Sequence, residues 1–379
     1  MQSQFLLLAA LTLFVYPFVI YPAILLLLPR RRGQAQPVEE SPAELPTVTL
    51  LICALNEEKV IGRTLGHAVA LNYPKDKLRI VVVSDGSTDS TADVVRQFAG
   101  SGVQLIDQAR RRGKVTNLNE VVPSLPDQIV VLLDANVSCD PQALLHLVRR
   151  FANPAVGCVS AKVVLTGTLD VLHGSEQNYY SLEWFLQEQA SSLYSMPGVD
   201  GALYAFRPEL FRRYPYDTLI EDFVIGVEIV RQGKRVVFEP RAMAWETGPT
   251  SIAEEFRRKV RIAAGAAQAL VRGNGFPRGA PWRFWFVFVS HKLLRWLSPI
   301  IGMAALLIAL ASWRRPFSQL VLAGFLALAA AAVLRLVTKR QHPLLDGPFY
   351  FLMGQVSMTL GLAKGITGTQ SVLWAKADR

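Results

Sequence analysis

Residues 78–89 read LRIVVVSDGSTD, a run of β-branched side chains that gives way to polar residues at Asp85. Two further apolar runs, at residues 47–55 and 128–133, also end in polar side chains. Helix-like stretches occur between and after these runs, at residues 60–70, 88–99, 114–122 and 141–151. Strands that alternate with helices predict an α/β domain with a largely parallel sheet that is covered on both faces.

The polar residues that follow these strands are the first candidates for a functional site, because ligands bind at the carboxyl ends of the strands in such sheets. They are Asn56, Glu57, Asp85, Asp134 and Asn136. Asp134 stands where a ligand of a hard cation belongs, since Mg²⁺ and Mn²⁺ prefer carboxylate and phosphate oxygens. Taken alone, Asp134 is equally consistent with a cap of the following turn, and Asp85 with the start of a helix.

The first part of the chain, residues 1–32, has the composition of a membrane-spanning helix. Residues 5–28 carry no charge, and about 20 apolar residues suffice to cross the hydrocarbon core. Three arginines follow at positions 30–32, whereas a secretory signal would have its positive residues in front of the apolar run. These arginines predict that the next segment is cytosolic. The polar, proline-rich residues 33–46 are expected to link the helix to a folded domain at 47–250.

Charge and hydropathy change after residue 250. Residues 251–340 hold 14 Lys or Arg and only two acidic residues, within a chain of 379 residues whose net charge is +10. A basic belt beside apolar helices indicates a membrane surface rather than nucleic acid, because no nucleic-acid motif accompanies it. We expect an amphipathic interface segment at 251–282, then a region at 283–379 with two to three membrane crossings and a tail.

The apolar runs of this last region leave the topology in conflict. Runs at 284–311 and 318–336 predict a hairpin that returns the chain to the cytosol. His291, Lys292 and Arg295 within the first run are expected near an interface or facing a cavity. The last run, 348–366, is less apolar and contains Lys364 and several glycines. We predict that it crosses and places the tail outside, with a re-entrant segment as the alternative.

Six motifs occur in order along the predicted domain. They are ALNEE at 54–58, VVVSDGSTD at 81–89, RRGKVTNLNE at 111–120, LLDANV at 132–137, VDGALYAFRPE at 199–209 and IEDFVIG at 220–226. This series resembles the signatures of family-2 glycosyltransferases over about residues 47–272. The flanking apolar helices resemble the membrane-bound cellulose-synthase-like and hyaluronan-synthase-like branch. The resemblance implies a Rossmann-like GT-A fold and an inverting hexosyltransferase that uses a nucleotide-sugar, with a UDP-sugar expected first.

The resemblance also implies roles for individual residues on the donor side. Asn56, Glu57 and Asp85 would contact the nucleoside, because their oxygens can accept hydrogen bonds from base and ribose. Lys114 would lie near the nucleotide and offset the charge of its phosphates. A solvated cation at the start of a helix is the structural alternative for Lys114.

On the acceptor side, Asp222 matches the catalytic base of these enzymes, with Glu221 beside it. A base at this position takes the proton of the acceptor hydroxyl while that oxygen attacks the anomeric carbon. Asp200 and Gly201 match the acceptor-side loop, where a small residue lets a sugar approach the backbone. The alternative is that Glu221 and Asp222 only favour the N-terminus of the next helix.

Two positions depart from the family pattern. Asp134 matches the first residue of the DxD motif, but Asn136 stands at the third, so we expect Mg²⁺ or Mn²⁺ to be held by one carboxylate and the donor diphosphate. Processive members carry Gln-x-x-Arg-Trp on the interface helix, whereas this chain lacks the tryptophan there. Arg258 and Arg261 remain available to stabilise the diphosphate. Trp374 resembles a C-terminal Trp element of the same branch.

The first functional hypothesis is therefore a multi-pass enzyme of the inner (cytoplasmic) membrane with a cytosolic catalytic domain. It would add one or a few sugars to a lipid-linked or cell-surface glycan. The alternatives are a processive polysaccharide synthase that exports its product and a polyprenyl-phosphate sugar transferase, whose lipid phosphate would suit the basic interface. A non-catalytic membrane sensor that binds a nucleotide is the alternative from another class.

Overall fold

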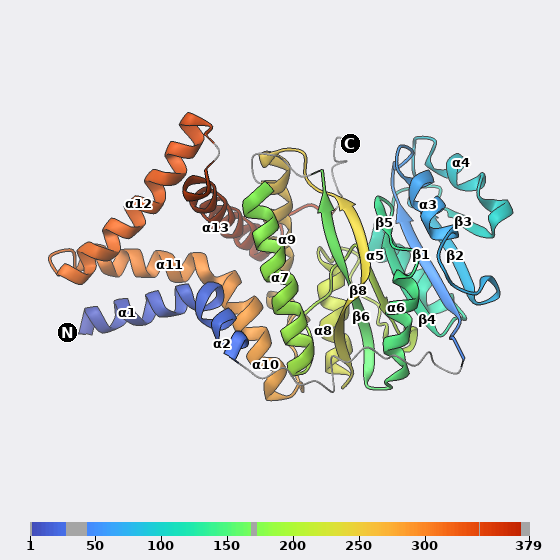
Figure 1. Ribbon diagram of the computed structural model, residues 1–379, viewed down its shortest axis with the longest axis horizontal. Coiled ribbons are helices and arrows are strands. Elements are labelled where there is room, and N and C mark those ends of the chain that lie inside the picture. Colours follow the sequence, from blue (N-terminus) through green and yellow to red (C-terminus); the bar gives the residue numbers. More distant parts are fainter. Residues whose placement is uncertain (1, 28–43, 168–172, 341, 373–379) are drawn as a thin grey trace.

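The computed structural model describes residues 2–27, 44–167, 173–340 and 342–372. Figure 1 shows a sheet-containing part at one end of the molecule and a group of long helices at the other. Helices α7 (His173–Leu193) and α9 (Ile252–Arg272) run between the two parts. Most of the predicted linker, the three arginines at 30–32 and Trp374 lie outside the described residues.

In the described chain, eight strands form one sheet in the order β3-β2-β1-β4-β7-β6-β8-β5. The first half is parallel, as predicted, and consists of β1 (Val48–Ala54), β2 (Leu78–Ser84), β3 (Val103–Asp107) and β4 (Ile129–Asp134), of which β3 was not predicted from the sequence. The second half is mixed and consists of β5 (Val137–Cys139), β6 (Val156–Thr166), β7 (Leu203–Phe206) and β8 (Arg235–Thr247). Strand β7 runs antiparallel to both of its neighbours, β4 and β6, where sequence analysis had predicted a largely parallel sheet.

Helices cover both faces of the sheet, which explains why its first strands are apolar without alternation. In β1, Leu50 and Ile52 face one core, while Leu51 faces the other. The first core is closed by α3 (Ile61–Val69), α4 (Thr91–Arg96) and α6 (Ala143–Arg149). The second is closed by α5 (Lys114–Val121), α8 (Glu221–Arg231) and α9. The carboxyl ends of β1, β2 and β4 therefore meet at one edge.

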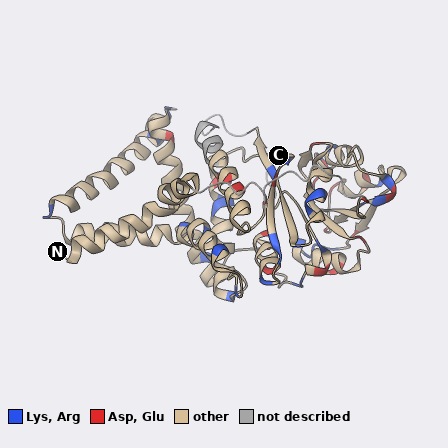
Figure 2. Ribbon diagram, turned by 60° about the horizontal axis from the view of Figure 1, so that its bottom comes forward, with Lys and Arg blue, Asp and Glu red and all other residues tan. Residues whose placement is uncertain are grey.

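Within the described ranges, three helical segments have the length and composition to cross a membrane: Gln2–Leu27, Trp282–Ala311 and Pro316–Thr338. The first contains α1 (Gln2–Val15) and α2 (Tyr21–Leu27), the second α10 (Trp282–Phe288) and α11 (Leu294–Ala311), and the third is α12 (Pro316–Thr338). Figure 2 shows that these helices carry few charged residues along most of their length. On α12, Leu320, Leu326 and Val337 are 69%, 70% and 75% exposed, an apolar surface that suits lipid better than water.

The last long helix, α13 (Pro343–Thr367), is not one of these three candidate spans. It packs closely along α9 because glycines face that helix. A Cβ atom added to Gly361 would lie 2.5 Å from the carbonyl oxygen of Val260, and one added to Gly365 would lie 2.2 Å from that of Ala264. Small residues are what such close helix packing requires. The crossing of residues 348–366 stays a prediction, while their helix forms a wall of the cavity described below.

Candidate active site

A cavity of about 1200 Å³ opens at the carboxyl edge of the sheet and extends toward the candidate spans. Strand ends, the start of α8, α9 and α13 line it. It collects every described residue for which sequence analysis predicted a role: Asn56, Glu57, Asp85, Lys114, Asp134, Asn136, Asp200, Gly201, Glu221, Asp222, Arg258 and Arg261. Residues that are up to about 200 positions apart in the chain therefore share one cavity.

Lys114 connects two of the predicted acidic positions. Its Nζ atom lies 2.8 Å from Oδ1 of Asp134, at the end of β4, and 2.9 Å from Oε1 of Glu221, at the start of α8. Burial disfavours the charged amine, but the two carboxylates outweigh that effect and raise the pKa of Lys114 well above its usual value. Burial likewise acts against ionised Glu221, yet the Lys114 charge leaves the pKa of this carboxyl lowered. The amine is therefore a fixed positive charge between two carboxylates.

Asp85 holds the loop that delivers Lys114. Its Oδ1 accepts hydrogen bonds from the backbone N–H of Arg112 at 2.8 Å and from the Asn117 side chain at 2.9 Å. Its Oδ2 accepts from the backbone N–H of Gly113 at 2.9 Å. In the next position, Gly86 has a φ of 69°, and a Cβ there would lie 2.4 Å from the backbone of this loop. The SDG turn is thus shaped by the close passage of the loop.

Asn56 and Glu57 join the first two motifs. Asn56 has a φ of 56°, a left-handed conformation that asparagine tolerates better than most residues. Its Oδ1 accepts a hydrogen bond from the backbone N–H of Thr88 at 2.8 Å. The backbone N–H of Glu57 donates to the Thr91 hydroxyl at 2.7 Å. These contacts fix the ends of β1 and β2 beside each other at the rim of the cavity.

Asp222 lies against the acceptor-side loop. A Cβ atom added to Gly201 would lie 2.9 Å from Oδ2 of Asp222, so a side chain at position 201 would displace this carboxylate. The other oxygen, Oδ1, accepts a hydrogen bond from the backbone N–H of Phe223 at 2.8 Å. Burial, with the neighbouring Glu221 carboxylate, raises the pKa of Asp222 to about 6. A carboxylate that holds a proton this readily is suited to act as a general base near neutral pH.

Glu246 is a cavity residue that sequence analysis missed. It stands at the end of β8, and its Oε1 accepts a hydrogen bond from the Asn136 side chain at 3.3 Å. Burial, together with the Glu246 charge, raises the pKa of Asp200 to about 7. Asn136 therefore contacts a neighbouring carboxylate. Glu246 lies in the stretch WET at 245–247, outside the six motifs of the sequence.

The two arginines of α9 have different surroundings. Arg261 is close enough to Glu221, Asp222 and Asp134 for all three carboxylates to stabilise its charge, although burial dominates and lowers its pKa. Arg258 points to another group of residues and donates to Glu255 at 2.8 Å. Only Arg261 thus belongs to the same charged cluster as Lys114.

The metal-ligating side chains of the cavity suit a hard cation that takes most of its ligands from the substrate. Among the described residues, no group of three or more His, Cys, Asp or Glu side chains is placed to hold a metal ion. Asp134 nevertheless faces the cavity with its side chain 35% exposed. One protein carboxylate plus phosphate oxygens is a common way to bind Mg²⁺. The residues present therefore fit a metal that arrives with a diphosphate.

Comparison with known proteins decides the family. The model of the glycosyltransferase-like family 2 matches residues 46–265, which is more than half of the chain. The chain belongs to this family. This glycosyltransferase is 25% identical over 263 residues to poly-β-1,6-N-acetyl-D-glucosamine synthase of Staphylococcus epidermidis. The aligned region covers 68% of this chain and 61% of that protein. It is 26% identical over 236 residues to the synthase of that name from Staphylococcus aureus (strain COL), covering 60% and 57%.

This glycosyltransferase thus spans about three fifths of the length of the curated relatives it matches. A solved structure resembles nearly all of it: a mannosyltransferase from Pyrobaculum calidifontis in complex with GDP-Man and Mn²⁺. The TM-score is 0.75 with 23% sequence identity, and the match covers 97% of this chain and 100% of that chain. The predicted GT-A fold with apolar helices is confirmed by this likeness.

Asp85 offers a test of the loop geometry. We expect Asp85→Asn to lower the free energy of unfolding by about 1–3 kcal/mol, because an amide cannot accept from all three donors and leaves a buried N–H unpaired. Thermal unfolding of the ligand-free protein measures this loss. Asp107→Asn is the matched control, since its ion pair with Arg96 is exposed and contributes about 1 kcal/mol or less. Equal melting temperatures for both variants would contradict the role of Asp85.

Proposed function

We propose that this protein is an inverting membrane glycosyltransferase that moves a sugar from a nucleotide-sugar, first of all a UDP-sugar, to a lipid-linked or cell-surface glycan. The observation that carries the proposal is the position of Asp222. Its carboxylate lies in the cavity against Gly201 and close to the charged cluster of Lys114 and Arg261. A proton acceptor thus stands beside the positive charge that a departing diphosphate needs.

The proposed reaction is a single displacement. The acceptor hydroxyl oxygen forms a bond to the anomeric carbon of the donor sugar, and its proton passes to Asp222. The bond between that carbon and the diphosphate oxygen breaks, and the nucleoside diphosphate leaves with the bonding electron pair. Attack opposite the leaving group inverts the anomeric centre. Asp222 is held for this task by the Phe223 N–H, which leaves its Oδ2 directed toward Gly201.

Lys114 and Arg261 would stabilise the negative charge that develops on the diphosphate. Asp134 would hold Mg²⁺ or Mn²⁺ together with phosphate oxygens, and the metal when bound would supply further positive charge to the leaving group. Asn56 and Glu57, at the strand ends, would line the nucleoside end of the same cavity. Asp85 would act on the donor side mainly by holding the loop at Arg112 and Gly113, which positions Lys114.

The names of the relatives favour a second candidate, a processive synthase of an N-acetylglucosamine polymer. Against it stands Ile262, which follows Arg261 in the cavity wall where processive members carry tryptophan. A polyprenyl-phosphate sugar transferase shares the donor chemistry. A nucleotide sensor would need no general base at position 222. The proposed location is the inner membrane, with the catalytic domain in the cytosol.

Asp222→Asn tests the base. We expect sugar transfer to fall by about 100-fold to 10,000-fold, because the amide keeps the size of the side chain but cannot take a proton. Binding of UDP with Mn²⁺ should change little, and isothermal titration measures it alongside turnover. Retention of more than about a third of the wild-type rate would exclude Asp222 as the base.

The rate should also depend on pH through Asp222. Its pKa is raised to about 6, so we expect the rate to fall as pH drops through 6 and the base becomes protonated. Glu221→Gln removes the like charge beside Asp222, lowers the pKa of the base and moves this acidic limb to lower pH. Glu228→Gln, on the same helix but outside the cavity lining, serves as the control. An acidic limb that does not move in Glu221→Gln would contradict the assignment.

Removal of divalent cations should abolish turnover. The described residues hold no group of three or more His, Cys, Asp or Glu side chains placed for a metal, so the ion proposed at Asp134 is expected to bind weakly without the donor and to be stripped by excess EDTA. Transfer and uncoupled donor hydrolysis are then measured before and after addition of Mg²⁺ or Mn²⁺. Full activity in excess EDTA would rule out a metal requirement.

A further inference from the structure

The cavity has a second half that the donor chemistry does not use. Candidate spans and the helices beside them form its walls: α7, the first turns of α9, the π-helical turn Val289–Leu293, α11 and α13. We call this half the membrane-side chamber. Its cationic side chains are Arg258, Lys259, Lys292 and Arg295.

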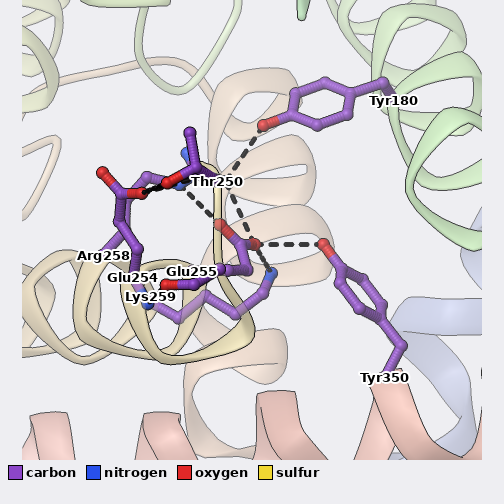
Figure 3. Close-up of polar contacts among 8 residues, drawn as sticks. Tyr180, Thr250, Glu254, Glu255, Arg258, Lys259 and Tyr350 are labelled. Atoms are coloured by element: carbon purple, nitrogen blue, oxygen red, sulfur yellow. Dashed lines mark hydrogen bonds and ion pairs between the residues drawn. The ribbon is translucent and has the colours of Figure 1, made fainter. Parts of the chain in front are cut away.

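Two of these cations share one buried carboxylate, as Figure 3 shows. Glu255 is fully buried and accepts from Nε of Arg258 at 2.8 Å, while Nζ of Lys259 lies 3.1 Å from its other oxygen. Tyr350 of α13 donates its hydroxyl to Glu255 at 3.2 Å, and Tyr180 of α7 accepts from Arg258 at 3.1 Å. Burial alone would raise the pKa of Glu255, but the two cations lower it to about 2.

The other two cations share a second carboxylate, that of Glu183, which lies three residues after Tyr180 on α7. Glu183 accepts a hydrogen bond from Arg295 at 2.8 Å, and Nζ of Lys292 lies 3.7 Å from its other oxygen. His291 also contacts Glu183, at 2.8 Å. The side chains of Glu183 and Arg295 are only 13% and 10% exposed. Both carboxylates thus face two permanent cations each.

Four cationic side chains and two carboxylates therefore meet in the described part of the chamber. Asp346 also lines the cavity and is paired with Arg335. Arg258 and Lys292 are the more accessible of the four cations, with side chains 34% and 27% exposed. Cations that face a cavity in this way can give charge-assisted hydrogen bonds to a bound anion.

Apolar walls connect the chamber to the candidate spans. Phe18, Trp296 and Phe351 line it, and Phe18 belongs to a second π-helical turn, Tyr16–Ile20. The two turns are joined by a hydrogen bond of 3.0 Å between the hydroxyls of Tyr16 and Ser290. π-Helical turns are rare and occur frequently at functional sites. The described walls of the chamber thus combine cationic side chains with aromatic ones, and Phe18 and Trp296 belong to candidate spans.

We propose that the membrane-side chamber binds the phosphate or diphosphate of a lipid-linked saccharide acceptor. The lipid tail would run along the apolar wall toward the spans, and the saccharide hydroxyl would reach Asp222. This inference rests on the proposed function and names its acceptor class. The lipid phosphate takes no part in bond making, since the hydroxyl forms the new glycosidic bond and gives its proton to Asp222. Its one or two negative charges suit a wall on which Arg258 and Lys292 face the cavity.

Binding of matched probes to the purified full-length protein tests the proposal. Farnesyl phosphate and farnesol share one isoprenoid tail and differ only in the phosphate, and inorganic phosphate carries the anion without the tail. We expect isothermal titration in detergent to show farnesyl phosphate binding at least about tenfold tighter than farnesol, as charge-assisted hydrogen bonds would give. Inorganic phosphate should bind more weakly than farnesyl phosphate, because it lacks the apolar tail.

Variants at Lys292 identify the site. Lys292→Gln should weaken farnesyl phosphate binding on the order of tenfold and leave the affinities for farnesol and for UDP with Mn²⁺ unchanged. Lys292→Arg keeps the charge and should restore binding. Arg283→Gln is the matched control, since Arg283 lies on the same helical segment but outside the cavity lining. If thermal unfolding shows that Lys292→Gln is misfolded, Lys259→Gln replaces it with the same expected loss.

Three results would overturn the proposal: equal affinity for farnesyl phosphate and farnesol, unchanged farnesyl phosphate binding in the charge-removing variant, or inorganic phosphate binding as tightly as the lipid. The last result would assign the chamber to a free anion. Each of these leaves the proposed function standing if UDP still binds and Asp222→Asn still abolishes transfer. Conversely, a protein that binds farnesyl phosphate through Lys292 but transfers no sugar would contradict the proposed function and not the lipid-phosphate site.

Discussion

The donor half of the cavity depends on the position of one amine, that of Lys114. Asp134 and Glu221 come from different elements, the end of β4 and the start of α8, and two neighbouring carboxylates would repel each other without a cation between them. The amine removes that repulsion and keeps Glu221 ionised. Ionised Glu221 in turn raises the pKa of Asp222 beside it. One ion-pair network thus fixes the geometry and also sets the proton affinity of the base.

The network explains why several motifs must occur together. Lys114 reaches its place because Asp85 holds the preceding loop and Gly86 lets that loop pass. Asp222 keeps its place because Gly201 has no side chain. Each motif therefore constrains a neighbour that is distant in sequence, and a change in one would be felt in the others.

Much of this could be predicted from the sequence, because parallel buried strands and the residues at their ends have local signatures. Strands β1, β2 and β4, the helix at 252–271 and the shared location of the motifs all follow from such patterns. Strand β7 and Glu246 could not be predicted, since antiparallel insertion and pairing across the sheet depend on tertiary contacts. Glu183 and Glu255 were missed for the same reason. Each looks like an ordinary polar residue of a helix, and only the packing of other helices surrounds it with cations.

The small residues of α9 join the two halves of the cavity. A Cβ atom on Gly265 would lie 2.6 Å from the side chain of Ile220, which directly precedes Glu221. On its other side, α9 meets the glycines of α13 through Ala263 and Ala264. Bulky residues here would push α9 away from α8 or α13 and would move Arg261 from the carboxylates that stabilise its charge. The alanine-rich sequence after Arg261 therefore lets one helix serve the donor cluster and the membrane-side chamber together.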